Sequence, residues 1–241
     1  MPTDKPYTDQ QLRELEERLV PSVRRMAIKT TTKILWRIAR SLGQAVKRFF
    51  DMILALLGLL AAMPILLPVA ALIKLTDGGS VLFWQTRIGK WGKPFRFPKF
   101  RSMVVNAEAL QKQLLAENVH GDGVTFKLKR DPRITWIGRI IRKTSIDELP
   151  QLWCVLKGEM SLVGPRPALE REVSRYSLDD RRRLDATPGL TCIWQVSGRS
   201  DVPFPKQVLM DVEYIEQQSL WYDIKLLFKT IPAVITGRGA Y

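Results

Sequence analysis

The chain has 241 residues, enough to bury one good core or to carry one domain with appendages. Its net charge is +14, from 38 basic against 24 acidic residues, which indicates a polyanionic partner: nucleic acid, an anionic membrane or a phosphorylated substrate. With two cysteines and one histidine, the sequence indicates neither a disulfide framework nor a metal site or catalytic triad built on histidine.

Residues 1–46 form an N-terminal extension. A helical pattern over 9–20 is interrupted at Pro21, and a second pattern follows in "KILWRIARSLGQAVKRFF". Its apolar residues fall on one face and its basic residues mostly off it. An ordinary helix on a soluble core would look the same, but the apolar segment that follows favours a basic amphipathic helix lying on anionic membrane lipid.

Residues 52–73 carry no charge. As one straight helix they would extend for about 33 Å, against a hydrocarbon core of roughly 30 Å. Pro64 and Pro68 stand one turn apart and predict a kink or break, and basic residues on both flanks favour a cytoplasmic location for both ends. We therefore expect a re-entrant helix-hairpin over 47–75, broken at these prolines; the alternative is a single spanning helix.

Residues 76–241 read as one cytoplasmic domain. "VLFWQTRIGKWGKPFRFPKFRSM" predicts a small β-hairpin around a Gly-rich turn. "DPRITWIGRIIRKTS" predicts a loop and a short basic helix, and further helices alternate with Pro/Gly loops. The predicted fold class is α+β and mainly helical, with a re-entrant membrane helix, interfacial amphipathic helices and one small hairpin.

The stretch "TSIDELPQLW" places two acids side by side, Asp147 and Glu148. Ser145 and Glu148 match the spacing of a helix capping box, so the pair on its own is an ordinary helix start. Pro150, however, prefers the first helical position and keeps the residue before it out of the α conformation. The acids would then lie in the turn before the helix, facing whatever anion binds at its N-terminus.

Several polar side chains on stiff segments accompany these acids. Arg166 lies between two prolines, and arginines on rigid loops suit bidentate phosphate recognition. Taken singly, each of these residues is better explained as a solvated surface charge. Together with two adjacent acids they indicate phosphate chemistry with a divalent cation. The candidate phosphate-binding residues are Lys99, Arg101, Arg142, Arg166, Gln195 and Arg199.

From about Lys47 onward the chain resembles the bacterial sugar transferases, also called monotopic phosphoglycosyl transferases. The resemblance rests on four stretches in order: "KRFFDMILALLGLLAAMP", the hairpin sequence above, "SIDELPQLWCVLKGEMSLVGPRP" and "PGLTCIWQVSGRS". It is greatest for undecaprenyl-phosphate galactose or glucose phosphotransferases that initiate exopolysaccharide, capsule or O-antigen synthesis. It implies a UDP-hexose donor, undecaprenyl phosphate as acceptor, Mg²⁺, and a catalytic domain on the cytoplasmic face of the bacterial inner membrane.

The resemblance also implies residue roles. Asp147 would be the nucleophile that takes the phosphosugar and expels UMP, as well as the candidate metal ligand. Glu148 would be its partner acid, fixed by Arg142. Two positions depart from the family pattern: Met63 stands where a serine often precedes the breaking proline, and Cys192 stands where glycine is usual.

The rival interpretation is a non-catalytic basic membrane scaffold or a nucleic-acid-binding protein. It accounts for the charge of +14. The basic residues cluster beside an apolar segment, however, and the sequence has no helix-turn-helix, zinc or RNA-binding signature, so we do not expect nucleic acid as a partner. The sequence leaves the identity of the sugar and the oligomeric state open, a homo-oligomer included.

Overall fold

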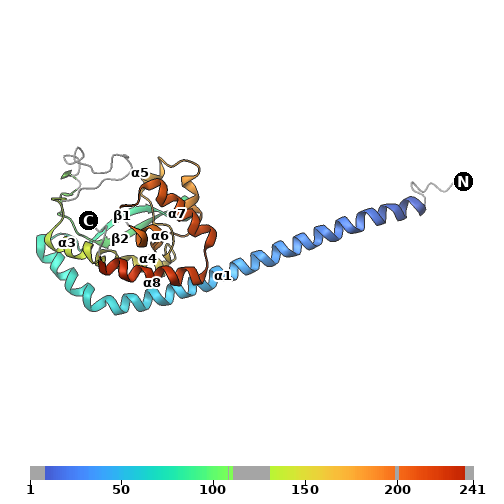
Figure 1. Cartoon of the computed structure of the whole chain (residues 1–241). Helices are drawn as coiled ribbons and strands as arrows, with labels where there is room; N and C mark the ends of the chain where they lie inside the picture. The colour runs from blue at the N-terminus through green and yellow to red at the C-terminus, as the bar shows by residue number, and fades with distance from the viewer. Residues whose placement is uncertain (1–8, 108, 111–130, 199–200, 237–241) are drawn as a thin grey trace. The chain divides into compact units, whose positions relative to one another are not determined.

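A computed structural model describes residues 9–107, 109–110, 131–198 and 201–236 (Figure 1). The chain divides into two units, residues 1–46 and 47–241, and each is considered by itself. In the first unit, helix α1 (Asp9–Asp77) is already continuous through Pro21. The interruption predicted there was wrong, because a proline removes one helical hydrogen bond but leaves the turns on either side free to form. The lipid-binding role of this extension stays a prediction.

In the second unit, α1 continues as an apolar helix with one face packed on the domain. Its buried apolar residues recur at helical spacing and are Ala55, Ala62, Leu66, Val69 and Ile73. Most of its other side chains are large, apolar and exposed, among them Leu57, Leu60 and Leu67. The segment Ser41–Asp77 is long and apolar enough to cross a membrane. An exposed apolar surface of this kind is typical of a contact with lipid.

Pro64 and Pro68 lie on the exposed face of α1. Both positions are helical, and the domain part of the helix curves so that its end rises beside α3 (Trp136–Lys143; Figure 1). Packing supports this course, because the residues from Ala62 to Ile73 contact Ile137 and Ile141 of α3. The path of this helix into and out of one leaflet stays a prediction.

The predicted hairpin is confirmed. Strands β1 (Leu82–Ile88) and β2 (Pro94–Phe100) are antiparallel, with Phe83 opposite Lys99 and Arg87 opposite Phe95. The turn between them contains a short 3₁₀ segment, η1 (Lys90–Gly92). Since cross-strand partners lie on the same face of a sheet, this register places Arg87 and Lys99 on one face, together with the buried ring of Phe97.

The rest of the domain is mainly helical, as predicted. A second sheet, which the sequence did not reveal, pairs two three-residue parallel strands, β3 (Ser161–Val163) and β4 (Gly189–Thr191). The main core gathers around Phe97, Leu152, Val155 and Tyr214. The other elements are η3 (Ile146–Gln151), α4 (Leu152–Lys157), α5 (Glu170–Val173), η4 (Asp180–Asp185), α6 (Ile193–Ser197), α7 (Phe204–Gln217) and α8 (Leu220–Thr236).

Candidate active site

The two acids lie in the first turn of η3, directly after α3. Ser145 turns the chain between these helices in a left-handed conformation (φ 57°), and its side chain makes no cap hydrogen bond. The capping box that the Ser145–Glu148 spacing would allow is therefore absent. The helical segment begins at Ile146 rather than at Pro150, as a 3₁₀ turn that leads into α4. A 3₁₀ turn accommodates Pro150 with less loss, since the segment is short and few of its amides have helical acceptors.

Asp147 is buried, with 9% of its surface exposed. Burial and the neighbouring charge of Glu148 raise the pKa of Asp147 to about 7, and the positive charges of Lys99, Arg142 and Arg166 lower it only in part. Asp147 therefore titrates near pH 7, because it loses water and has a second acid beside it.

Glu148 is ion-paired with Arg166. The Arg166 Nη2 donates to Glu148 Oε1 at 2.6 Å, and both side chains remain about a quarter exposed. Burial raises the pKa of Glu148, but the charge and hydrogen bond of Arg166 outweigh it, and this pKa lies below its ordinary value. The expected anchor of Glu148 was Arg142. The structure assigns that role to Arg166, while the charge of Arg142 acts on Asp147.

The hairpin supplies two more cations to this site. Burial and the charge of Arg87 lower the pKa of Lys99 to about 8. Burial and the charge of Arg166 lower the pKa of Arg87 to about 10. Arg87 donates through Nη1 to the carbonyl of Pro167 at 3.0 Å, whereas its buried Nε has no protein partner. Cations that share a partly dehydrated space repel one another, and an anion placed among them would relieve that repulsion.

The charge count defines what the site can bind. Four cations, Arg87, Lys99, Arg142 and Arg166, act on two carboxylates, of which Asp147 is only partly ionised near pH 7. This surplus of positive charge suits a diphosphate, and a carboxyl group within it suits covalent catalysis on phosphorus. Arg87 was missing from our predicted site. The hairpin register could have revealed it, since Arg87 shares a face with Lys99.

The remaining predicted residues have other surroundings. Arg101 is buried and ion-paired with Asp77 at the end of α1. Gln195, in α6, accepts a hydrogen bond from the thiol of Cys192 at 3.0 Å. Arg199 lies outside the described residues. The phosphate-binding roles of Arg101, Arg142, Gln195 and Arg199 stay predictions.

The acids present fit only one mode of Mg²⁺ binding. Among the residues that the structure describes, no three histidine, cysteine, aspartate or glutamate side chains come together as a metal site. Mg²⁺ is commonly held by one or two carboxylates together with substrate phosphates and water. Asp147 can serve as such a carboxylate, because its neighbour Glu148 is already engaged by Arg166.

Comparison with known proteins agrees with this geometry. The family model described as bacterial sugar transferase matches residues 42–237. The chain belongs to the bacterial sugar transferase family. Within that family it is 45% identical over 218 residues to a UDP-galactose-lipid carrier transferase of Erwinia amylovora, and 46% identical over 208 residues to an undecaprenyl-phosphate galactose phosphotransferase of Salmonella typhimurium.

These matches cover different shares of the relatives. They take in 86% and 85% of this chain but only 45% and 43% of those two proteins, so the chain spans less than half their length. It is also 42% identical over 205 residues to the exopolysaccharide production protein ExoY of Sinorhizobium fredii, of which the match covers 91%. The matched region contains every described residue of the site.

Proposed function

We propose that this chain transfers a hexose 1-phosphate from a UDP-sugar to undecaprenyl phosphate and releases UMP, so initiating a polysaccharide on its lipid carrier. The observation that carries the proposal is the buried carboxyl of Asp147 among Lys99, Arg87 and the Glu148–Arg166 pair. The names of the relatives support the two substrates: a galactose phosphotransferase acting on undecaprenyl phosphate, and a UDP-galactose-lipid carrier transferase.

The reaction has two displacements at one phosphorus atom. An Asp147 carboxylate oxygen attacks the phosphorus that bears the sugar, and the bond from that phosphorus to the bridging oxygen breaks. UMP leaves with the bridging oxygen and the electron pair. A phosphate oxygen of the lipid then attacks the same phosphorus, the Asp147 oxygen–phosphorus bond breaks, and the carboxylate is regenerated as the lipid diphosphate sugar departs.

The neighbouring side chains give each half of this reaction its charge balance. Arg166 fixes Glu148, so that the second carboxylate is not free to repel the incoming phosphate oxygens. Lys99 and Arg87 face the charge that builds up on the transferred group and on UMP. Mg²⁺, held by Asp147 with the phosphate oxygens, would supply further neutralisation of the diphosphate.

The proposed location is the cytoplasmic face of the bacterial inner membrane, with the 47–75 segment re-entrant in one leaflet. The exposed apolar face of α1 supports it, as do Trp221, Phe228 and Ile231, which are exposed along α8. Cysteines placed at positions 40 and 80 should be labelled from the same side. Labelling from opposite sides would leave the transferase proposal intact but replace the hairpin with a spanning helix.

The deciding experiment uses the full chain in detergent with Mg²⁺, undecaprenyl phosphate and a panel of UDP-sugars. UMP release and a labelled lipid product are expected with one or a few sugars, UDP-galactose and UDP-glucose first. Intact-protein mass spectrometry without the lipid should find a hexose-phosphate adduct that maps to Asp147. UMP release that requires the lipid, with no adduct on any residue, would exclude the covalent step and keep only direct transfer.

A further inference from the structure

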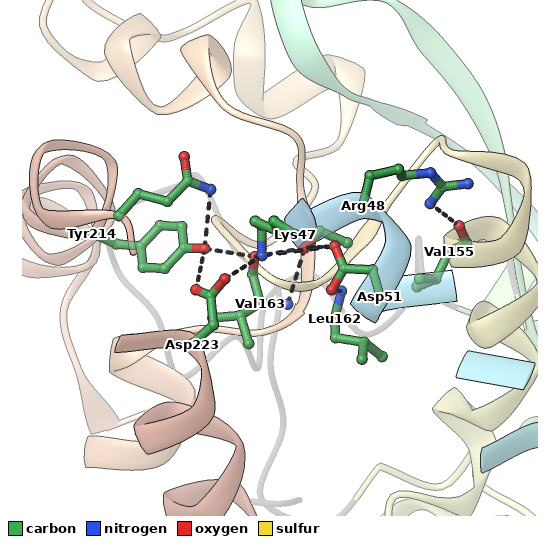
Figure 2. Close-up of polar contacts among 10 residues, drawn as sticks. Lys47, Arg48, Asp51, Val155, Leu162, Val163, Tyr214 and Asp223 are labelled. Atoms are coloured by element: carbon green, nitrogen blue, oxygen red, sulfur yellow. Dashed lines mark hydrogen bonds and ion pairs between the residues drawn. The ribbon is translucent and has the colours of Figure 1, made fainter. Parts of the chain in front are cut away.

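A buried polar network joins the start of the domain part of α1 to strand β3 (Figure 2). Asp51, only 6% exposed, accepts hydrogen bonds from the Ser161 hydroxyl at 2.7 Å and from the Leu162 amide at 3.2 Å. Lys47 lies 3.7 Å from the Asp51 carboxylate and donates to the carbonyl of Val163 at 3.3 Å.

Two helices from the end of the chain complete the network. Asp223 of α8 accepts from Lys47 at 2.5 Å and from the hydroxyl of Tyr214 at 2.7 Å. Tyr214, on α7, also lies 2.8 Å from the carbonyl of Val163. Lys47, Asp51 and Tyr214 of this network therefore all contact β3, a strand of only three residues.

An apolar side chain at position 51 would pack α1 onto the domain at a lower free-energy cost, because a buried charge loses its hydration and needs other interactions to offset that loss. Asp51 instead provides directional hydrogen bonds to β3. Strand β3 pairs with β4 along one edge only, so the Leu162 amide on the other edge needs an acceptor. Asp51 supplies it from a helix and thereby fixes the strand along its own length.

The connection from β3 to the active site is short and stiff. Gly164 and Pro165 alone separate Val163 from Arg166. An added Cβ on Gly164 would lie 2.4 Å from the carbonyl oxygen of Thr187, so the backbones are in close contact there. Prolines on both sides of Arg166 restrict its backbone further. A shift of β3 would therefore be passed on to the guanidinium that holds Glu148.

The same turn of α1 also supports the acidic side of the site. Arg48 donates to the carbonyl of Leu156 at 2.8 Å and to that of Val155, both in α4. Helix α4 follows η3 without a break, and η3 carries Asp147 and Glu148. This turn of α1 thus contacts β3 and α4, the two elements that adjoin the segments carrying Arg166 and Glu148.

We propose that Asp51 is a positioning residue: by fixing β3 it sets the placement of Arg166 against Glu148, and so couples the seating of the membrane helix to phosphosugar transfer. This inference rests on the proposed function. It assigns Asp51 no contact with substrate. Its effect on the rate must therefore pass through Arg166.

The test is a double-mutant cycle on the full chain in detergent, with kcat for UMP release as the readout. Asp51→Ala should lower kcat about tenfold or more. In an Arg166→Lys background, whose side chain no longer provides the planar fork, the same change should cost only about twofold, a coupling of at least about fivefold. Val208→Ala, which truncates a buried residue of α7, is the control for general destabilisation and should have the same effect in both backgrounds.

Asp51→Asn separates positioning from charge. Its amide oxygen still accepts from the Leu162 amide, and its NH₂ can donate to the Ser161 hydroxyl, which then donates to Val163. Asp51→Asn should keep kcat within about threefold of wild type although it removes the charge opposite Lys47. Equal losses for Asp51→Asn and Asp51→Ala, or an additive cycle, would overturn the inference. Failure of the wild-type protein to release UMP with any sugar would instead refute the proposed function.

Discussion

Two arginine–carboxylate pairs in this domain have similar lengths and opposite surroundings. Arg183 and Asp211 are joined at 2.5 Å with 5% and 1% of their side chains exposed. The Arg183 guanidinium lies 5.7 Å from the ring centres of Tyr176 and Phe204, and donates to the Tyr176 hydroxyl. This pair is enclosed and balanced, one cation to one anion.

The Arg166–Glu148 pair is neither enclosed nor balanced. Both side chains are about a quarter exposed, and Lys99, Arg87 and Asp147 act on it through their charges. A pair that only holds a fold together gains from enclosure, whereas a pair that handles substrate needs access and a surplus of the charge opposite to its ligand. The comparison predicts that damage to the first pair affects stability and damage to the second affects turnover.

The largest expected effect is the loss of turnover when Asp147, next to the exposed Arg166–Glu148 pair, is replaced. Asp147→Asn should reduce sugar transfer and UMP release at least about a thousandfold, as expected when a nucleophile is removed. Its fold should survive. The pKa of Asp147 is higher in the folded protein than in an unfolded chain, so ionising it as the pH rises through about 4 to 7 costs stability. The asparagine variant avoids that cost, and its thermal unfolding midpoint at pH 8 should equal or exceed that of wild type. An active variant would leave the acids with a structural role only.

The enclosed pair gives the next largest effect, and it is one of stability. Arg183→Ala leaves Asp211 buried without its partner, which costs about 3–5 kcal/mol, or roughly 6–20 °C in the unfolding midpoint. Burial already raises the pKa of Asp211 to about 6. The loss should therefore be smaller at pH 5, where Asp211 can take up a proton. Arg166→Ala, measured in parallel, should shift the midpoint much less; an equal shift would remove the distinction between the two pairs.

Local sequence patterns predicted the elements whose formation depends on neighbours in the chain. The apolar run that became α1 and the hairpin with its Gly-rich turn both have short-range signals. The family assignment was made from four separate stretches, and the match to the family model over residues 42–237 confirms it. The continuity of α1 through Pro21 was missed because a proline removes one helical hydrogen bond and need not end the helix. The 3₁₀ start at Ile146 was missed because Pro150 was taken to mark the first helical residue.

Contacts between distant residues were beyond sequence patterns. Strands β3 and β4 have three residues each, too few to show an alternation, and they pair across 25 intervening positions. The partner of Glu148 was predicted from proximity in sequence as Arg142, but the fold brings Arg166 to it from 18 residues away. The raised pKa of Asp147 depends on burial, which no local pattern reports.

A smaller effect on turnover should come from replacing the guanidinium of the Arg166–Glu148 pair with another cation. Arg166→Lys retains a cation beside Glu148 but loses the planar fork of donors, so kcat should fall about ten- to a hundredfold with little change in the unfolding midpoint. Steady-state UMP release over a range of UDP-sugar concentrations measures this. Full activity of Arg166→Lys would reduce Arg166 to a general source of positive charge. Arg183→Lys, the matched change in the enclosed pair, should lower the unfolding midpoint and leave the kcat of folded enzyme unchanged.

The smallest expected effect is on the pH dependence of UMP release, which changes in the Arg166–Glu148 pair should alter and changes in the Arg183–Asp211 pair should not. If Asp147 attacks as a carboxylate, the rate of UMP release at low UDP-sugar concentration should rise with pH and level off above an apparent pKa near 7, the value set by burial and by Glu148. From pH 7 to pH 8 the gain is then only about twofold. Glu148→Gln removes the neighbouring negative charge that raises this pKa, so the midpoint of the surviving activity should move to lower pH, although turnover itself is lower. Arg183→Lys has no such route to Asp147 and should leave the midpoint where it is. A wild-type profile that is flat from pH 5 to 8 would show that the titrating carboxyl is not the attacking group, and Asp147 would then remain a candidate metal ligand or base.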